Sequence, residues 1–592
     1  MVRIVTLVKR ARHLGGAVFP ALSAEQRDPT SDFVRAGLFD LPYYRAQLPE
    51  AERPRSLSEA RRHYIATGRA AGLSIHPFIE PEWWDPHANT DDEDHLGRER
   101  WLIHGGQRGS STSPLIADPV GSIGATRDYL KDLLEGRVQA RIPGGLTATA
   151  AVQQMTRAVD RGLRRTPNAG TASNVDWAAV RKGLSERVPG RTSVLVPTFE
   201  DWRMTVESVR ASLAEPVEGD IEVIVVDNGS RLAVFRCLTA VFLGEPRVRL
   251  VRCSVNTNFA GGMNRAIAES TGEYIVLLNN DAVLSPGWRA PLIAALDDMT
   301  VRGAQPLLLY PATNRVQAAG TMFLGEGVLP WHFLAGHPRD DADRMTNLSF
   351  RAVTAAVMVM RAADLVDASG FDEEFENGYE DVDLCLRMLR DPRDRFLLVR
   401  ESIAVHPEGS SAGRSARDSE NRVRFFRRWA GRMPSPEPER YLDIGMRLSR
   451  MRPLWYSPEV PIVVTDPQVE RERPVVGEGP ATGRPSLRWM LLTGDADRAV
   501  VEQTRAALLD LGQECVEVHG GAHWSDVLAD VVVGFSGAGP TFPRAGAFNV
   551  SVSPGPGDEH AQTVTDGSTT DLLRVIAEME TWEKTVFPGA ES

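Results

Sequence analysis

The sequence predicts an α/β fold in which a mostly parallel sheet is flanked by helices, with a helical N-terminal region before it and a small C-terminal α/β domain after it. Short β-branched runs alternate with amphipathic stretches from residue 191 onward, as in a parallel sheet covered on both faces. Residues 33–116 instead carry a degenerate helical repeat, and a shorter set of alternating runs begins at residue 487. Because 592 residues exceed the roughly 250–300 that one hydrophobic core supports, we expect several domains.

Residues 1–32 form a basic, amphipathic N-terminus. Lys9, Arg10 and Arg12 interrupt an apolar run that is too short for the core of a secretory signal. Two interpretations stay open: a helix lying on an anionic membrane surface, or a frayed or docked terminus. The sequence does not reach the roughly 18 consecutive apolar residues of a membrane span, so we do not expect a membrane-spanning synthase.

The repeat region, residues 33–116, contains two similar helical units. FDLPYYRAQL at 39–48 is echoed by FIEPEWWDPH at 78–87, and each unit places an aromatic pair before a helical stretch. The pairs are Tyr43 with Tyr44 and Trp83 with Trp84. We favour a core position for these aromatic side chains over a sugar-binding platform.

The rest of the chain divides by composition. We expect a helical spacer at 117–190, an α/β domain at 191–435, a Pro-rich charged linker at 436–486 and a small Rossmann-like domain at 487–592. Within the α/β domain the β-branched runs lie at 192–196, 221–226, 247–251 and 273–278.

Charge and cysteine content exclude several classes of protein. A net charge of −12 disfavours a nucleic-acid partner, which requires a basic face. The four cysteines, Cys237, Cys253, Cys385 and Cys515, include no CxxC pair, so we expect buried thiols in a reducing compartment and no zinc site.

Polar residues follow the predicted strands at the points where they end. Asp227 follows the run at 221–226, Asp281 follows the run at 273–278, and His406 follows a later apolar run. Because ligands bind outside the carboxyl ends of strands in open α/β sheets, we expect these three residues to share one edge. A carboxylate with an imidazole suits Mg²⁺ or Mn²⁺, although each residue alone could be a turn residue or a core histidine.

Residues 256–264, NTNFAGGMN, open a predicted helix after the strand at 247–251. The paired Gly261 and Gly262 allow a close backbone approach to an anion, with free N–H groups of the first helical turn pointing at it. The motif is neither a GxGxxG nor a Walker loop, so it indicates no particular ligand by itself.

The stretch 370–387 places three carboxylates at the start of an amphipathic helix, Glu380, Asp381 and Asp383. They are either an acidic first turn stabilised by the helix dipole or the site of a general base. Asp383 and Arg387 are four residues apart and are expected to pair, which leaves Asp381 to face the cleft. An EF-hand is excluded, because Asp372 is not followed by alternating ligands with Gly at the sixth position.

Taken together in this order, residues 191–430 resemble the family-2 glycosyltransferases of the nucleotide-diphosphosugar (GT-A) fold. The variant most resembled is the rhamnosyltransferase and galactofuranosyltransferase-like group that acts on bacterial cell-surface glycans. The motifs that carry the resemblance are VPTF at 196–199, VDNGS at 226–230, NTNFAGGMN at 256–264, LLNND at 277–281, GFDEEF at 370–375, YEDVDLCLR at 379–387 and His406.

The resemblance implies a role for each matching position. Thr198 and Asp227 would contact the base and ribose of the nucleotide, and the remaining nucleotide-sugar-binding positions would be Pro197, Asn258, Gly261, Asn264 and Asn280. Asp281 and His406 would hold a divalent Mn or Mg ion. Asp381 would be the catalytic base, with Glu380 helping to place a substrate.

Three positions depart from the family pattern. Asn279-Asn280-Asp281 has one carboxylate where many members have two or three, and Glu200 stands where Asn is frequent. Arg428-Trp429 matches only the last two residues of the QxxRW motif of processive synthases.

The expected function is that of an inverting glycosyltransferase that uses a UDP- or dTDP-sugar and a cell-surface glycan or lipid-linked acceptor. We expect it in the cytoplasm, with peripheral contact at the inner face of the plasma membrane left open. The repeats resemble units that accompany surface-glycan glycosyltransferases and could bind protein partners. The C-terminal domain resembles a shortened half of a GT-B enzyme and is expected to be non-catalytic.

The sequence leaves two alternative functions. One is a non-catalytic nucleotide-sugar-binding or scaffold protein of a glycan-assembly complex. The other is a nucleotidyltransferase, which is disfavoured because PTFEDW at 197–202 is not the Gly-rich basic loop of such enzymes.

Overall fold

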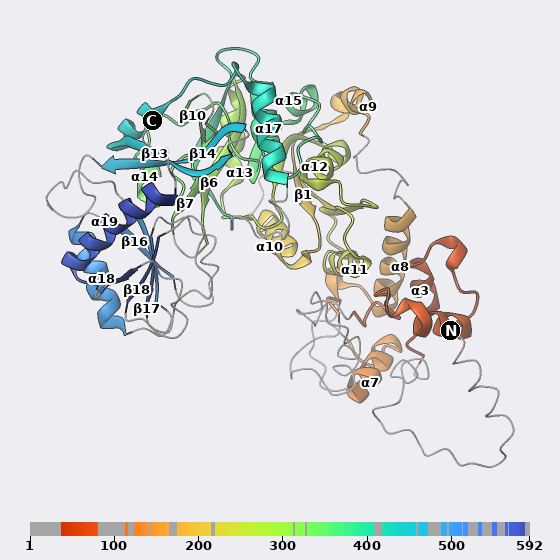
Figure 1. Ribbon diagram of the computed structural model, residues 1–592. Helices are drawn as coiled ribbons and strands as arrows, with labels where there is room; N and C mark the ends of the chain where they lie inside the picture. The colour runs from red at the N-terminus through yellow and green to blue at the C-terminus, as the bar shows by residue number, and fades with distance from the viewer. Residues whose placement is uncertain are drawn as a thin grey trace, which may run out of the picture. The chain divides into compact units, whose positions relative to one another are not determined.

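Figure 1 shows the computed structural model of the chain. It describes residues 37–80, 113–115, 123–139, 142–164, 175–214, 220–311, 314–325, 328–407, 417–457, 460–471, 487–493, 497–511, 513–518, 531–535, 548–552, 563–565 and 567–586. The chain divides into two compact units, the first made of residues 1–164 and 232–245 and the second of residues 165–231 and 246–592. Each unit is described by itself.

The first unit is helical, in agreement with the repeat pattern. Its elements are α3 (Leu41–Ala46), η2 (Glu50–Glu52), α4 (Leu57–His63), η3 (Tyr64–Gly68), α7 (Ile123–Leu134), η4 (Pro143–Gly145), α8 (Ala148–Arg164) and α11 (Leu232–Val241). Tyr43 and Tyr44 are fully buried in its core, so the core interpretation of this aromatic pair is confirmed. Trp83 and Trp84 lie outside the described residues.

A buried ion pair joins α11 to the repeat within this unit. Arg236 donates from Nε and Nη2 to the two carboxylate oxygens of Glu80, at 2.7 Å each, and from Nη1 to Gln47 Oε1 at 3.0 Å. Arg236 and Glu80 are 1% and 3% exposed. Buried charges persist only when they are paired, so this bridge fixes α11 to the repeat region.

The second unit contains the sheet that was predicted to be mostly parallel. Its strands are β1 (Val188–Thr198), β2 (Ile221–Asp227), β3 (Val248–Arg252), β4 (Gly272–Leu278), β5 (Val283–Leu284), β6 (Val301–Leu309), β7 (Val316–Ala318), β10 (Ser349–Phe350), β11 (Val357–Arg361) and β12 (Arg395–Val405). The order is β10-β12-β6-β11-β4-β1-β2-β3. β1, β2, β3 and β4 pair in parallel, β12 is parallel to β6, and β11 is antiparallel to β4 and β6. The predicted fold class is confirmed.

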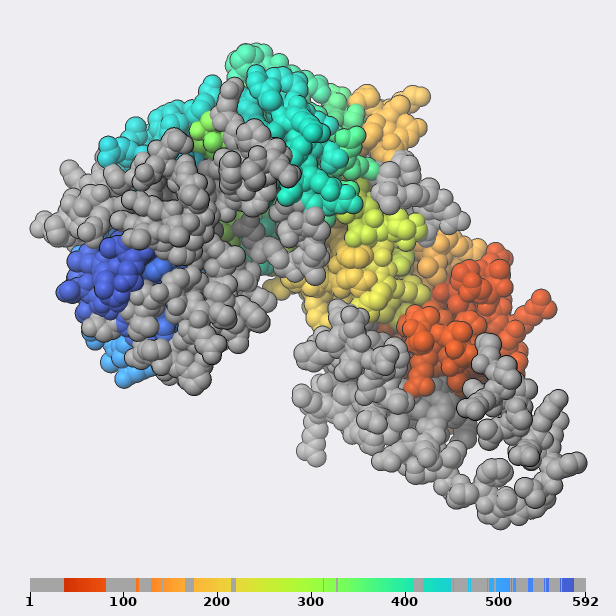
Figure 2. All heavy atoms as spheres, in the orientation of Figure 1, coloured from red at the N-terminus to blue at the C-terminus, as the bar shows by residue number. Residues whose placement is uncertain are grey.

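Helices connect and cover these strands. They are α9 (Trp177–Lys182), η5 (Gly183–Glu186), α10 (Trp202–Leu213), α12 (Asn258–Glu269), α13 (Arg289–Ala294), η6 (Ala295–Asp297), α14 (Arg339–Asp343), α15 (Ala362–Asp367), α16 (Glu380–Met388) and α17 (Asp418–Trp429), with a small hairpin of β8 (Thr321–Met322) and β9 (Trp331–His332). The teal segment at the surface in Figure 2 includes α17.

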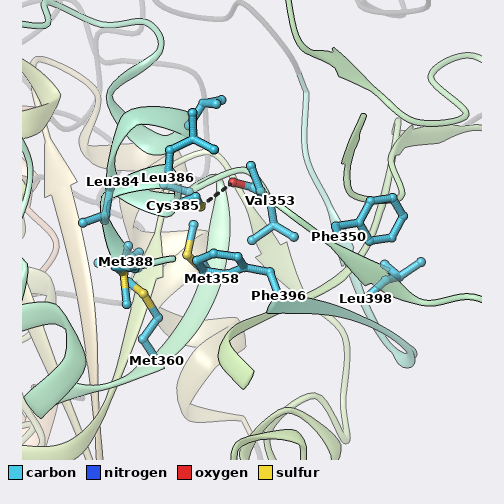
Figure 3. Close-up of a cluster of buried hydrophobic side chains, with 14 of the residues drawn as sticks. Phe350, Val353, Met358, Met360, Leu384, Cys385, Leu386, Met388, Phe396 and Leu398 are labelled. Carbon is cyan, nitrogen blue, oxygen red and sulfur yellow. Dashed lines mark hydrogen bonds between the residues drawn. The ribbon is translucent and has the colours of Figure 1, made fainter. Parts of the chain in front are cut away.

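One face of α16 is buried in the core drawn in Figure 3. Leu384, Cys385 and Met388 lie at helical spacing on that face, and the Cys385 thiol donates to the Val353 carbonyl at 3.5 Å. This packing fixes the helix whose first turn carries Glu380 and Asp381. Cys237 is also buried, whereas Cys253 and Cys515 are half-buried, so the expectation of buried thiols holds for two of the four.

The expected linker at 436–486 contains ordered structure. After η8 (Pro438–Ile444), strands β13 (Met446–Ser457) and β14 (Val460–Arg471) form an antiparallel ribbon, with Met446 and Val469 in the core. Pro453 and Pro467 indicated an irregular linker, but a two-stranded ribbon has only edge strands, where proline is tolerated. The division of the chain into domains stays a prediction.

The C-terminal segment forms a small parallel sheet, as predicted. It contains β15 (Arg488–Leu492), α18 (Arg498–Asp510), β16 (Glu514–Val518), β17 (Val531–Phe535), β18 (Phe548–Val552), β19 (Thr563–Thr565) and α19 (Thr569–Val586). The strand order is β16-β15-β17-β18-β19. Across the described part of the chain, none of the helices combines the length and apolar character that crossing a membrane requires.

Candidate active site

Three parallel strands of the second unit end at the same level. Thr198, at the end of β1, lies in register with Asp227 of β2, which lies in register with Arg252 of β3. The carboxyl ends of parallel strands therefore bring these polar residues to one edge of the sheet.

Asp227 is fully buried at this edge, and both of its carboxylate oxygens have partners. Oδ1 accepts from the Ser230 N–H at 3.0 Å, and Oδ2 pairs with the Arg252 guanidinium. Burial raises the pKa of Asp227, while Arg252 and the hydrogen bond from Ser230 act in the opposite direction. Thr198 also has a hydrogen-bond partner within the chain, since its Oγ1 lies 2.7 Å from Thr205 Oγ1.

Asn228 organises the start of α12, a role that the sequence reasoning did not assign. Its Oδ1 accepts from the Thr257 N–H at 3.0 Å and from Thr257 Oγ1 at 2.8 Å. Its Nδ2 donates to Asn256 Oδ1 at 3.1 Å and to the Asn258 carbonyl at 2.8 Å. The only sequence signal is its place beside Asp227 in the VDNGS motif.

Two N–H groups of the first turn of α12 already have partners, contrary to the expectation of free N–H groups for residues 256–264. The Asn258 N–H donates to Asn256 Oδ1 at 2.8 Å, and the Phe259 N–H donates to Asn377 Oδ1 at 3.1 Å. Side-chain oxygens of two asparagines therefore accept the hydrogen bonds that an anion would otherwise accept.

The two glycines of this helix serve close packing. A Cβ at Gly261 would lie 2.6 Å from Thr257 Cβ, and one at Gly262 would lie 3.0 Å from Asn228 Nδ2 and 3.5 Å from Pro197 Cβ. Pro197, Gly262 and Asn258 therefore lie around Asn228, whereas Gly261 packs against Thr257.

Asn264 binds the loop that precedes α16. Its Nδ2 donates to the Phe371 carbonyl at 2.9 Å and to Glu373 Oε1 at 2.8 Å, and its Oδ1 accepts from the Phe371 N–H at 2.8 Å. The side chain is buried, so these contacts make it an anchor of that loop.

Asp281 and His406 come together, as predicted from their places after two strands. β5 pairs antiparallel with β12, with Val283 opposite Val405, so the two segments just outside this short ladder, which carry Asp281 and His406, lie close together. Asp281 Oδ1 lies 3.3 Å from His406 Nε2, and both side chains are buried. Asn280 instead points to Thr205, donating from Nδ2 to Oγ1 at 3.4 Å.

The surroundings of this pair fit a divalent cation. Asn279 Nδ2 lies 3.3 Å from His406 Nε2, while Asn279 Oδ1 and His406 Nδ1 are buried without a hydrogen-bond partner among the described residues. Buried polar atoms are normally paired, so these two atoms indicate a site that a ligand completes. One carboxylate, one imidazole and one amide oxygen suit Mg²⁺ or Mn²⁺ when substrate phosphates supply further ligands. No group of three or more His, Cys, Asp and Glu side chains in the described ranges could hold a metal alone.

The start of α16 presents Glu380 and Asp381 differently. Glu380 is buried, and its carboxylate accepts from the Gly378 N–H. Asp381 is half-buried, and its carboxylate accepts from the Ala355 N–H at 3.1 Å and from the Val382 N–H at 2.8 Å.

Asp383, two residues later, is fully buried and bound by charged side chains. Its Oδ2 accepts from Arg387 Nε at 2.7 Å, which confirms the predicted pair. Its Oδ1 accepts from Arg428 Nη1 and from Trp429 Nε1, at 3.0 Å each. Arg428-Trp429 therefore serves to bind α16, and Asp383 is a structural carboxylate.

Comparisons with known proteins identify the domain that carries this edge. Residues 193–364 match the sequence model of Glycosyl transferase family 2. The chain is 30% identical over 243 residues to the uncharacterised protein y4gI of Sinorhizobium fredii, across 40% of this chain and 26% of that protein. It is 25% identical over 368 residues to the O-antigen biosynthesis protein RfbC of Myxococcus xanthus, across 58% of this chain and 28% of that protein.

The chain thus spans little more than a quarter of the length of these two curated relatives. Among solved structures, the mannosyltransferase PcManGT from Pyrobaculum calidifontis, in complex with GDP-Man and Mn²⁺, aligns with 17% identity and a TM-score of 0.30, over 49% of this chain and 74% of that one. The family match covers the strands that end at Thr198, Asp227, Arg252 and Leu278. The chain therefore contains a glycosyl transferase family 2 domain at residues 193–364.

Proposed function

We propose that this protein is an inverting glycosyltransferase that moves a sugar from a UDP- or dTDP-sugar to a cell-surface glycan or lipid-linked acceptor. The family 2 domain supports glycosyl transfer, and the name of the O-antigen relative is in keeping with a surface glycan. The rhamnosyltransferase-like subtype, the donor and the acceptor belong to this proposal.

The observation that carries the proposal is that Asp281 and His406, which would hold the cation, lie near Asp381, the proposed base. The Asn279 N–H donates to the Ala356 carbonyl at 2.9 Å, and the Ala355 N–H donates to Asp381 at 3.1 Å. Two adjacent residues, Ala355 and Ala356, therefore contact both the segment of Asp281 and the carboxylate of Asp381. A glycosyl transfer needs both a diphosphate site and a general base that reaches the acceptor hydroxyl.

In the proposed reaction Asp381 acts as the general base. Its carboxylate accepts the proton of an acceptor hydroxyl while that oxygen forms a bond to the anomeric carbon. The bond from the anomeric carbon to the diphosphate oxygen breaks on the opposite face, which inverts the configuration and releases the nucleoside diphosphate. Glu380, held by the Gly378 N–H, fixes the turn and helps to place a substrate.

The donor side is assigned to the other end of the edge. Pro197, Thr198, Asp227, Asn258, Gly261, Asn264 and Asn280 would frame the nucleotide-sugar. Because Asp227 and Asn264 already have partners in the chain, their contribution is to hold the frame rigid. A Mn or Mg ion bound by Asp281 and His406 would offset the charge on the departing diphosphate.

The proposal also covers the location of the reaction and the roles of the two flanking regions. We place the reaction in the cytoplasm, where nucleotide-sugars are available, with contact at the inner face of the plasma membrane for a lipid-linked acceptor. The N-terminal repeats would bind protein partners, and the C-terminal domain would be non-catalytic.

The test is release of UDP or dTDP from a panel of nucleotide-sugars, with lipid-linked and soluble glycan acceptors, in Mn²⁺, Mg²⁺ or EDTA. Cation-dependent release from one donor, lost in Asp381→Asn, is the expected result. Nucleotide binding by calorimetry without release from any donor and acceptor pair would favour the non-catalytic scaffold. If the protein neither binds nucleotide nor releases it, both functions are overturned.

A further inference from the structure

The starts of α12 and α16 are joined by one side chain. Thr257, the residue before α12, makes no side-chain cap to the helix. Asn377, which precedes α16, supplies that cap from 118 residues away, since its Oδ1 accepts from the Phe259 N–H at 3.1 Å. Its Nδ2 also donates to Asn258 Oδ1 at 3.5 Å.

The backbone between Asn377 and Asp381 is fixed in an unusual path. Asn377 has φ 59° and Tyr379 has φ 68°, in the left-handed region that few non-glycine residues adopt. Between them, the Gly378 N–H donates to the Glu380 carboxylate. A displacement of Asn377 is therefore passed on to Asp381 through a turn that has little freedom to absorb it.

The rest of the loop is held on both sides. Asn264 of α12 binds Phe371 and Glu373 at the start of the loop. Asn421 of α17 accepts from the Glu376 N–H at 3.2 Å and donates to the Glu376 carbonyl at 2.8 Å. Asn377 is thus the contact through which the end of the loop, next to the proposed base, meets the proposed donor side.

We propose that Asn377 is a positioning residue that couples the first turn of α12 to the turn presenting Asp381. This inference rests on the proposed function. The amide oxygen of Asn377 accepts from the start of α12. Through this contact, the ordered donor side fixes the position of Asp381 relative to the reacting sugar.

Two variants at this position separate the side chain from the backbone. Asn377→Gly keeps the left-handed backbone without strain and removes the acceptor. Asn377→Asp keeps an acceptor for the Phe259 N–H, and its negative charge suits a helix N-terminus. Asn314→Gly is the matched control, because Asn314 is another left-handed asparagine, with φ 52°, and is exposed.

The first readout is hydrogen exchange of the protein without ligand. In Asn377→Gly we expect the amides of both 258–261 and 380–383 to exchange about fivefold faster, the loss expected from one helix cap. Asn377→Asp and Asn314→Gly should leave both segments unchanged. Faster exchange confined to 258–261 would overturn the coupling, whatever the activity of the protein.

The second readout is turnover with the donor identified in the release assay. Asn377→Gly should lower kcat by about 10- to 100-fold, as a misplaced base does, with the Kd of the nucleotide changed less than about threefold. Asn377→Asp should restore kcat to within about threefold. Equal losses in the two variants, or an unchanged kcat in Asn377→Gly, would overturn the positioning role. If the wild type neither binds nucleotide nor releases it while the exchange result holds, the proposed function fails and the coupling stands.

Discussion

The two sides of the candidate site differ in how completely their polar groups are paired. On the side of β1 to β3, Asp227 has partners for both oxygens, and Asn228 accepts two hydrogen bonds and donates two. On the side of β4 and β12, Asn279 Oδ1 and His406 Nδ1 are buried without a partner among the described residues. The first side is paired within the chain, and under the proposed function a ligand would pair the two remaining atoms of the second side.

The same contrast separates two carboxylates of one helical turn. Asp383 is bound by Arg387, Arg428 and Trp429, whereas among the described residues the hydrogen bonds to Asp381 come from backbone N–H groups. Charge-assisted hydrogen bonds such as those of Asp383 are the stronger ones, so Asp383 stabilises the fold. Asp381 is the carboxylate that the proposed function uses as the base.

The largest effect is expected at Asp381. Asp381→Asn should reduce kcat by about 10³-fold or more, because the amide cannot take the proton of the acceptor hydroxyl. Its amide oxygen can still accept from the Ala355 N–H, so the Kd of the nucleotide should stay close to that of the wild type. Steady-state turnover and calorimetry measure the two quantities, and near-normal turnover would show that another group is the base.

Asp281 is expected to give the next largest effect. Asp281→Ala should weaken cation-dependent nucleotide binding by about 10- to 100-fold, the loss known even for residues that only support a metal ligand. In the variant, titrations with Mn²⁺ and with EDTA should give the same Kd. Asp298→Asn is the control, because Asp298 is exposed and paired with Arg395 at the start of β6, away from the carboxyl edge. Cation-dependent affinity that survives in Asp281→Ala would exclude this site.

The parts of the site that could be predicted are those whose residues lie at the end of a strand or at helical spacing in the sequence. Asp281 and His406 follow strands, and Asp383 and Arg387 lie one helical turn apart, so short-range geometry indicates each pair. The amide network of Asn228 and Asn377 could not be predicted, because it joins segments far apart in sequence through single side chains. The β13–β14 ribbon was missed because prolines, which disfavour a central strand, are compatible with an edge strand.

Substitution of Asp383 should change the stability of the fold and leave the transfer reaction nearly unchanged. Asp383→Asn removes the charge that Arg387 and Arg428 share, and should lower the free energy of unfolding by about 2–4 kcal/mol, since the partners of a buried charge lose their compensation. Turnover per folded molecule should remain within a few-fold of wild type. Urea unfolding of the second unit measures the change.

Asp372→Asn is the matched comparison for Asp383→Asn. Asp372 binds the same Arg428, but a quarter of its side chain is exposed, and hydrogen bonds from Glu374 and Arg428 together with nearby guanidinium charge hold its pKa below the usual value despite the opposing effect of burial. Its loss should lower the free energy of unfolding by about 1 kcal/mol or less. Equal losses of stability in the two variants would remove the distinction between buried and exposed partners of Arg428.

The effect that is smallest at neutral pH concerns another buried histidine, His76 in the first unit, and tests whether hydrogen-bond pairing separates structural from ligand-binding histidines. His76 Nδ1 accepts from the Phe78 N–H at 3.1 Å, whereas His406 Nδ1 has no partner in the described structure. Burial lowers the pKa of His76 from its ordinary 6.5 to about 3, and a ring nitrogen that accepts a hydrogen bond must be unprotonated. His76 is therefore a structural histidine that is neutral in the folded state.

The sign of its pH dependence follows from which state takes the proton. Above pH 6.5 both states carry a neutral ring, so His76 contributes no pH dependence there. Below that pH the unfolded chain binds a proton that the folded unit does not, and the free energy of unfolding should fall by about 1.4 kcal/mol per pH unit until the folded pKa is reached. His76→Asn keeps an acceptor for the Phe78 N–H and cannot titrate. Hydrogen exchange of α3 and α8 between pH 7 and pH 5 should show a shallower decline of stability in His76→Asn than in wild type. Equal declines would mean that this nitrogen does not distinguish the folded from the unfolded state, and would weaken hydrogen-bond pairing as the criterion that separates His76 from His406.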